Sequence, residues 1–236
     1  MRKIKNLLVC GLLVLATVAL AACGKADKNV QQGEIMKGAD LQAIMDDKEV
    51  KENYLVIDVR SAEEYNAGHV KFAINIPVGE LESRISEIES WKDKNVVVYC
   101  NTGKKSAEAK TILDGKGFTK TFDAEGVKVY SYNLVTFGNC RYNELIKYVE
   151  EGAFIVDMRT AEDYGKAHFA NAINGNVDDL DAMKASLPED KNTLIITHCY
   201  SGNRSAVAAQ YLIDLGYTNV INCMDGAKEV EFDFSK

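Results

Sequence analysis

The chain contains a long internal repeat with a fixed offset of 99 residues. Residues 58–75 recur without a gap as residues 157–174, and 9 of these 18 positions are identical. The same offset carries Cys100 onto Cys199. A repeat of this length in two copies indicates duplication of a whole domain, because solenoid arrays use much shorter units. We therefore expect two complete domains of the same fold in tandem.

The first 22 residues have the pattern of an export signal. A basic start at Arg2, Lys3 and Lys5 precedes an apolar run over residues 7–22, which is too short to span a membrane comfortably. The run ends in Leu-Ala-Ala-Cys at residues 20–23, which resembles the bacterial lipobox. This resemblance implies cleavage before Cys23 and lipidation of its thiol. The alternative is a plain signal peptide in which Cys23 is incidental.

This reading divides the chain into a lipoprotein signal, a tether and two domains. We expect the signal in residues 1–22, the tether in 23–34, and the domains in 35–133 and 134–236. The protein is then extracytoplasmic, anchored by lipid to the cell membrane, or to the outer membrane if one exists. Cleavage leaves 25 basic and 35 acidic residues, a formal charge of −10, which argues against a nucleic-acid partner.

Each half of the chain alternates short apolar strands with amphipathic helices. The expected strands are residues 54–57, 73–76 and 96–99 in the first half, and 153–156, 172–173 and 194–197 in the second. The expected long helices are residues 105–116 and 205–215. Continuous apolar strands alternating with helices are typical of an α/β fold with a parallel sheet. We expect a central parallel sheet with helices on both faces in each domain, a linker near residues 130–138, and contact between the domains.

A cysteine follows the last expected strand of each half and opens a loop of the form Cys-x-x-Gly-x-(Lys/Arg)-Ser. Ligands of open α/β sheets bind at the carboxyl ends of the strands, where these cysteines lie. Backbone N–H groups of the loop and the start of the following helix can lower a thiol pKa and stabilise an anion on the sulfur. Gly103 and Gly202 permit the required dihedral angles. Arg204 supplies a fixed cation, and Lys104 or Lys105 a less rigid one.

The two loops carry a resemblance to a known family. The second loop consists of Cys199, Tyr200, Ser201, Gly202, Asn203, Arg204 and Ser205. It closely resembles the active loop of the rhodanese family of sulfurtransferases. The first consists of Cys100, Asn101, Thr102, Gly103, Lys104, Lys105 and Ser106. It is similar to the loop of small exported single-domain rhodaneses. Two other family segments are matched at residues 58–60 and 68–70.

The chain departs from the family pattern in three places. The first loop has lysine where arginine is usual, and Ala167 replaces the usual glycine before His168. The polypeptide also ends soon after residues 225–227, so we expect its last helix to be short.

The resemblance implies covalent sulfur transfer without a cofactor. The thiolate of Cys199 or Cys100 attacks a donor such as thiosulfate, and the resulting persulfide passes its outer sulfur to cyanide or a thiol. The other twelve loop residues would form the anion cradle. Cysteine phosphatases of related fold have five residues between Cys and Arg, whereas Cys199 and Arg204 are separated by four, which favours sulfur over phosphate. We expect Cys199 to dominate because its loop carries the arginine.

Three other interpretations remain open. Either cysteine can be a structural thiol that ends a buried strand. The chain can be a non-catalytic binding lipoprotein whose cradles recognise an anionic or sulfur-containing ligand or a protein. It can also be a redox protein whose thiols cycle through sulfenate or a mixed disulfide.

Other polar residues are expected to be structural. We expect Asp58 and Asp157 to cap a short helix, and Arg60 and Arg159 to pair with a nearby glutamate; the alternative is a direct role in the chemistry. His69 and His168 are expected to be hydrogen-bonded scaffold. His198, next to Cys199 on its strand, should point to the opposite side; the alternative is that it modulates the thiol. A metal site is not expected, because the chain has three histidines and no clustered thiols.

Cys140 and Cys223 have no cysteine counterparts in the first half. In the rhodanese fold the segments that contain them are neighbours in the sheet, so the resemblance implies that a disulfide can join them. Such a bridge would stabilise the fold by about 4 kcal/mol in the chain-entropy model. The alternative is two separate buried thiols.

Overall fold

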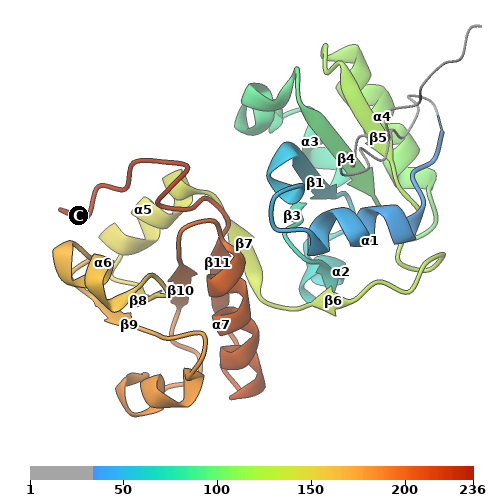
Figure 1. Ribbon diagram of the computed structural model, residues 1–236. Coiled ribbons are helices and arrows are strands. Elements are labelled where there is room, and N and C mark those ends of the chain that lie inside the picture. Colours follow the sequence, from blue (N-terminus) through green and yellow to red (C-terminus); the bar gives the residue numbers. More distant parts are fainter. Residues whose placement is uncertain (1–33) are drawn as a thin grey trace, which may run out of the picture.

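The computed structural model describes residues 34–236, which fold into two α/β domains. The expected signal, and Cys23 with it, lie outside the described residues. Figure 1 shows the two domains as separate sheets with their own helices, joined through β6 and β7. Between residues 34 and 236, no helix is long and apolar enough to cross a membrane.

The first domain is built on a four-stranded parallel sheet in the order β3-β1-β4-β5. Its strands are β1 (Tyr54–Asp58), β3 (Ile74–Asn75), β4 (Asn95–Tyr99) and β5 (Lys120–Asp123). Its helices are α1 (Gly38–Asp46), η1 (Lys51–Asn53), α2 (Ala62–Asn66), α3 (Val78–Leu81), η2 (Ile85–Trp91) and α4 (Lys104–Gly115). The apolar centres of β1 and β4 are fully buried, as continuous apolar parallel strands require.

The second domain repeats this plan with one strand more, in the order β7-β11-β10-β8-β9, and every pairing is parallel. Its strands are β7 (Gly138–Cys140), β8 (Phe154–Asp157), β9 (Ala172–Asn174), β10 (Ile195–His198) and β11 (Val220–Cys223). Its helices are α5 (Tyr142–Glu150), α6 (Ala161–Lys166), η3 (Leu180–Ser186) and α7 (Asn203–Asp214). In the first domain, a single parallel bridge between Met36 and Ala124 stands in the place of β7. The predicted α/β fold class is confirmed.

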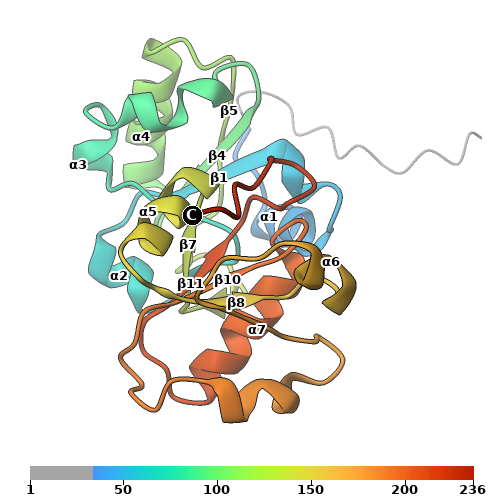
Figure 2. The ribbon, with the colours of Figure 1, turned by 90° about the vertical axis from the view of Figure 1, so that its left-hand side faces the viewer.

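The domains contact each other along the segment that joins them. Strand β6 (Leu134–Val135) pairs antiparallel with β2 (His69–Val70) of the first domain, and β7 then joins the second sheet. Asn139 on β7 donates its side-chain amide to the carbonyl of Ala73 at 3.0 Å. One cluster of buried apolar side chains includes residues of both domains, and Figure 2 shows β7 near their boundary. The expected contact between domains is therefore present.

The C-terminal segment differs from expectation. Residues 224–236 contain turns but no helix, so the short last helix expected there is wrong. The segment instead forms turns, and Phe232 and Phe234 pack on Phe169 with ring centroids 6.2 and 5.0 Å away. Burial of these rings replaces the apolar face that a helix would have provided.

Candidate active site

Both loop cysteines lie at the carboxyl ends of central strands. Cys100 follows β4 and Cys199 follows β10, and α4 or α7 begins four residues after the cysteine. Both side chains are buried. Gly103 and Gly202 adopt left-handed conformations with φ of 99° and 72°, which favour glycine. The repeat therefore produces two cysteine loops of the same design.

The first loop forms hydrogen bonds to its sulfur. The backbone N–H of Gly103 donates to Cys100 Sγ at 3.2 Å, and Ser106 Oγ lies 3.5 Å from the same atom. Burial raises the pKa of Cys100, but hydrogen bonds from Ser106 and from the backbone of Thr102 and Gly103 outweigh it, so the pKa is lowered. A lowered pKa increases the fraction of thiolate, which is the nucleophilic form.

The second loop is packed more tightly. Cys199 Sγ accepts a hydrogen bond from Ser205 Oγ at 3.4 Å. A side-chain carbon added to Gly202 would lie 2.7 Å from the carbonyl oxygen of Met224, whereas one added to Gly103 would meet no atom within 4 Å. Gly226 is so close to Tyr200 that a side chain there would overlap its backbone. Gly126 packs on the backbone of Asn101 in the same way, so the two loops differ at the other glycine: the space beside Gly103 is open, whereas Met224 fills the space beside Gly202.

The residue after each cysteine donates a hydrogen bond to an acidic side chain on a short helix of the same domain, α2 or α6. Asn101 donates to Glu64 at 2.6 Å, and Tyr200 donates to Asp163. The Asn101 hydrogen bond is the main cause that lowers the pKa of Glu64, and the Tyr200 hydrogen bond is the main cause that lowers the pKa of Asp163 to about 2. Sequence reasoning missed the two acids. The signal for them was the acidic residue at the same repeat position in both halves.

The remaining loop residues surround the start of each long helix. Thr102, Lys104 and Lys105 are exposed, and Ser106 is fully buried. In the second loop, Asn203 donates to Ser201 Oγ at 3.0 Å. Arg204 is exposed, with its guanidinium 5.6 Å from the centroid of the Tyr200 ring. The predicted cations therefore lie beside the loops at the helix N-termini, where they favour an anion.

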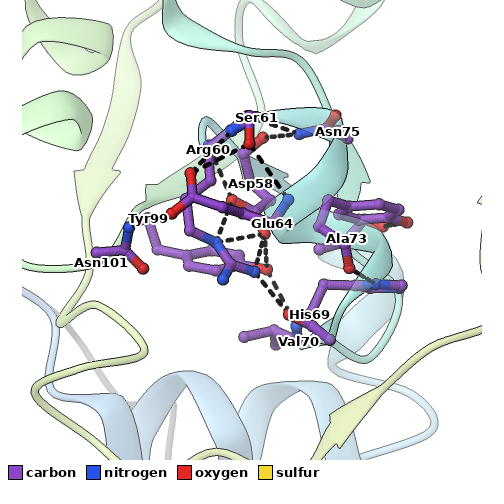
Figure 3. A network of polar contacts seen from close by, with 12 residues as sticks. Asp58, Arg60, Ser61, Glu64, His69, Val70, Ala73, Asn75, Tyr99 and Asn101 are labelled. Carbon is purple, nitrogen blue, oxygen red and sulfur yellow. Dashed lines mark hydrogen bonds and ion pairs between the residues drawn. The ribbon is translucent and has the colours of Figure 1, made fainter.

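A buried ion pair between Asp58 and Arg60 contacts Tyr99, the residue that precedes Cys100. Arg60 Nη2 donates to Asp58 Oδ2 at 2.6 Å and to the carbonyl of Gly68 at 2.7 Å, and Tyr99 donates its hydroxyl to Asp58 Oδ2 at 2.8 Å (Figure 3). Asp58 is 0% exposed. The second domain has the same pair between Asp157 and Arg159. In both domains the ion pair fixes the turn at the carboxyl end of an inner strand, β1 or β8.

The structural role expected for these residues is present, but the expected partners are wrong. Ser61, and not Asp58, caps α2, and it forms a capping box with Glu64. Arg60 pairs with Asp58 instead of a glutamate because the turn after β1 folds the guanidinium back over the carboxylate. The pairing leaves both charges compensated in a buried place.

The histidines lie in scaffold positions. Nδ1 of His69 hydrogen-bonds the carbonyl of Tyr65 at 3.0 Å, and Nδ1 of His168 hydrogen-bonds that of Tyr164 at 2.8 Å. Each ring also stacks on the same tyrosine. Burial lowers the pKa of His69 to about 4. The scaffold role predicted for both is confirmed.

Cys140 and Cys223 are in-register partners on β7 and β11, and both are buried free thiols. The disulfide that the family resemblance implied is not formed in this structure and stays a prediction, as does the alternative of two separate buried thiols. Neighbouring strands lie about 4.8 Å apart, which is within the range of about 4.4–6.8 Å between the α carbons of a disulfide, so the two residues are close enough for a bridge. The hydrogen bond with Cys223 and burial raise the pKa of Cys140.

Among the described residues, no group of three or more His, Cys, Asp or Glu side chains could hold a metal ion.

One contact to the second loop was missed from the sequence. Lys51, in the first domain, donates its ammonium to the carbonyl of Ser201 at 3.0 Å. Its distance along the chain from the loop left no local pattern that could reveal it.

Comparison with known proteins assigns the fold family. The model of the Rhodanese-like domain matches residues 38–132 and 142–231. Thiosulfate sulfurtransferase PspE of Escherichia coli (strain K12) is 46% identical over 72 residues, which are 30% of this chain and 69% of that protein. The tRNA uridine(34) hydroxylase of Cronobacter sakazakii (strain ATCC BAA-894) is 32% identical over 98 residues, 40% of this chain. The matched part is only 27% of the hydroxylase.

A solved structure described as rhodanese with anions from E. coli is 41% identical to this chain. The match covers 35% of this chain and 96% of that one, with a TM-score of 0.33. The family model covers both halves, in agreement with the internal repeat. The chain belongs to the rhodanese-like domain family and carries two such domains in tandem.

Proposed function

We propose that the protein is a sulfurtransferase that moves sulfane sulfur from a donor such as thiosulfate to a thiol or cyanide through a cysteine persulfide. The observation that carries this proposal is the hydrogen bond from the Gly103 backbone N–H to Cys100 Sγ at 3.2 Å. That N–H is directed at the sulfur atom that carries the negative charge of the attacking thiolate. The match to a thiosulfate sulfurtransferase supports the same chemistry.

The mechanism has two displacement steps. The Cys100 thiolate attacks the outer sulfur of thiosulfate, a new S–S bond forms, and sulfite leaves with the electron pair of the broken bond. The outer sulfur of the persulfide then carries the negative charge, within reach of the loop N–H groups and the N-terminus of α4. The acceptor nucleophile attacks that sulfur and restores the Cys100 thiolate.

The geometry favours Cys100 as the principal nucleophile, which reverses the expectation from the loop arginine. The Cys100 sulfur already accepts a backbone N–H, and the space beside Gly103 is open. The space beside Gly202 in the second loop is filled by Met224, although Arg204 lies beside that loop. In this proposal the second domain loads sulfur more slowly than the first.

We also propose that the protein works outside the cytoplasm and is held on a membrane by lipid at Cys23. Support comes from the basic start, the apolar run and the Leu-Ala-Ala-Cys ending of residues 1–23. Labelling cells with a radioactive fatty acid tests this. Label should appear in the wild-type protein and be absent from Cys23→Ala.

Steady-state kinetics test the proposed reaction. With thiosulfate and cyanide varied together, double-reciprocal plots should be parallel, because sulfite leaves before the acceptor reacts. Cys100→Ser should lose most of the turnover, and Cys199→Ser should retain most of it. Intersecting lines would contradict the persulfide intermediate, and loss of turnover only in Cys199→Ser would assign the reaction to the second domain.

A further inference from the structure

Lys51 is a buried cation that reaches across the domain boundary. It lies in η1 of the first domain, and its side chain is only 5% exposed, which is rare for lysine. Its Nζ donates to the backbone carbonyl of Ser201 at 3.0 Å, although the two residues are 150 positions apart. Ser201 belongs to the loop that follows Cys199.

The ammonium is fixed in place by its other neighbours. Glu52 forms an ion pair with it, and the centroid of the Phe72 ring lies 4.5 Å from Nζ. Phe72 has a φ of 64°, the left-handed conformation that a bulky side chain rarely adopts, so the fold holds this ring in position against a local backbone preference. With a carboxylate, a ring face and a carbonyl around it, the ammonium has one orientation in which its charge is compensated.

Lys51 helps to fix the orientation of one peptide group in the second loop, together with the side-chain amide of Asn203, which donates to the same carbonyl at 3.3 Å. The carbonyl of Ser201 and the N–H of Gly202 belong to the same peptide unit, and residues 34–236 contain no cis peptide bond. In a trans peptide these two groups point in opposite directions. Because Lys51 binds the carbonyl, the Gly202 N–H is directed away from Lys51. Gly202 is the repeat counterpart of Gly103, whose N–H donates to the sulfur of Cys100.

We infer that Lys51 is a positioning residue for the Cys199 loop, supplied across the domain interface, which holds the Gly202 N–H ready for an anion on the Cys199 sulfur. The first domain thereby supports the second loop. The repeat does not place a lysine from the second domain on the first loop in the same way. The repeat counterpart of Lys51 is Glu150, whose carboxylate pairs with Lys236 at 3.4 Å.

Gly226, which packs on the second loop, also lies close to the Lys51 and Glu52 side chains. Gly226 donates its N–H to Glu229 Oε2 at 2.9 Å, and Gly226 packs on the backbone of Tyr200. Burial raises the pKa of Glu229, and the nearby carboxylate of Glu52 raises it further, whereas Lys51 lowers it. Both the second loop and residues 224–226 therefore lie beside the ion pair of buried Lys51 and half-buried Glu52.

The test measures thiol reactivity in the full chain without any sulfur donor. A small reagent, methyl methanethiosulfonate, is applied over a range of pH, and peptide mass mapping gives the modification rates of Cys199 and Cys100 in the same sample. Lys51→Met should slow modification of Cys199 about fivefold at neutral pH, the factor for one ordinary hydrogen bond, and leave Cys100 unchanged. The midpoint of the Cys199 profile should move to higher pH.

Two further variants make the test specific. Lys51→Arg keeps the charge and should restore the Cys199 rate, and Lys48→Met removes an exposed lysine of the same segment and should change neither rate. If Lys51→Met does not fold, Lys51→Gln takes its place with the same expectation. An unchanged Cys199 rate, or an equal fall at both cysteines, would overturn the inference. The inference rests on the proposed function only in treating Cys199 as a site for sulfur, and failure of transfer would leave these rates unaffected.

Discussion

Tyr99 and His198 occupy the same repeat position, but only Tyr99 bonds to the buried aspartate beside it. The Tyr99 hydroxyl donates to Asp58 at 2.8 Å, whereas His198 Nε2 lies 3.6 Å from Asp157 Oδ2. Neither ring nitrogen of His198 has a hydrogen-bond partner in the described part of the chain. The ring is surrounded instead by the side chains of Phe169, Phe232 and Phe234.

This difference predicts acid sensitivity. Burial lowers the pKa of His198 from 6.5 to about 4. Above pH 6.5 the histidine is neutral in both the folded and the unfolded chain. Between pH 6.5 and about 4 the unfolded chain binds a proton that the folded chain does not, so stability falls as the pH falls, by about 2 kcal/mol at pH 5. His198→Tyr should remove this part of the loss.

Urea unfolding at pH 7.5 and pH 5.0 measures the effect. The difference in unfolding free energy between the two pH values should be smaller in His198→Tyr than in wild type. His69, whose pKa is also lowered to about 4 by burial, should leave a residual loss in the variant. Exposed His168 provides the control substitution His168→Tyr. Equal acid sensitivity of His198→Tyr and wild type would contradict the prediction.

The buried pair of Asp58 and Arg60 predicts a large effect from a small change. Asp58→Asn removes the charge that compensates a buried guanidinium and should destabilise the fold by about 3–5 kcal/mol. Glu80→Gln breaks an exposed ion pair with Arg84 and should change stability by less than about 1 kcal/mol. Denaturant unfolding compares the two, and similar losses would contradict the structural role given to Asp58.

Two glycines pack directly on the cysteine loops and permit a matched test. A side chain on Gly126 would overlap the backbone of Asn101, and one on Gly226 would overlap that of Tyr200. Gly126→Ala should slow sulfur loading at Cys100 by about tenfold to a hundredfold, because small displacements of a reacting group have effects of that size. Gly226→Ala should act on Cys199 alone.

The control is Gly115→Ala, which lies on α4 in open space and should leave both loading rates unchanged. Quantitative peptide mass mapping after brief exposure to thiosulfate gives the rate at each cysteine. Loss of loading at both cysteines in either single variant would show that the loops do not behave as separate sites.

Cys140 and Cys223 should remain reduced. When the protein is purified without reductant, denatured and alkylated, both cysteines should take up the reagent, because both are free thiols in the structure. Peptide mapping without reduction provides the measurement. A linked peptide that contains both residues would contradict this expectation.

The repeat predicted most of the fold because the strands and glycines that define it are local features. The sequence identified Cys100 and Cys199 at strand ends for the same reason. It could not reveal that Met224 fills the space beside Gly202, because Met224 reaches the second loop only after β11 is placed in the sheet. The contact of Lys51 with the second loop likewise depends on how two domains pack.

The partner of a charged residue was harder to predict from the sequence than its structural role. Asp58 and Arg60 were expected to be structural, yet their mutual contact depends on the course of the turn after β1. The C-terminal segment without a helix packs its aromatic rings on Phe169, a contact that periodicity alone does not encode.

The central claim is that a cysteine of these loops carries a persulfide, and peptide mass mapping of the full chain after thiosulfate treatment tests it most directly. The digest is prepared without reductant so that an added sulfur is retained. We predict a Cys100 peptide heavier by one sulfur atom, with less of that form at Cys199. No added sulfur on either peptide, with both thiols free and able to react with an alkylating reagent, would contradict the proposed sulfur transfer from this donor.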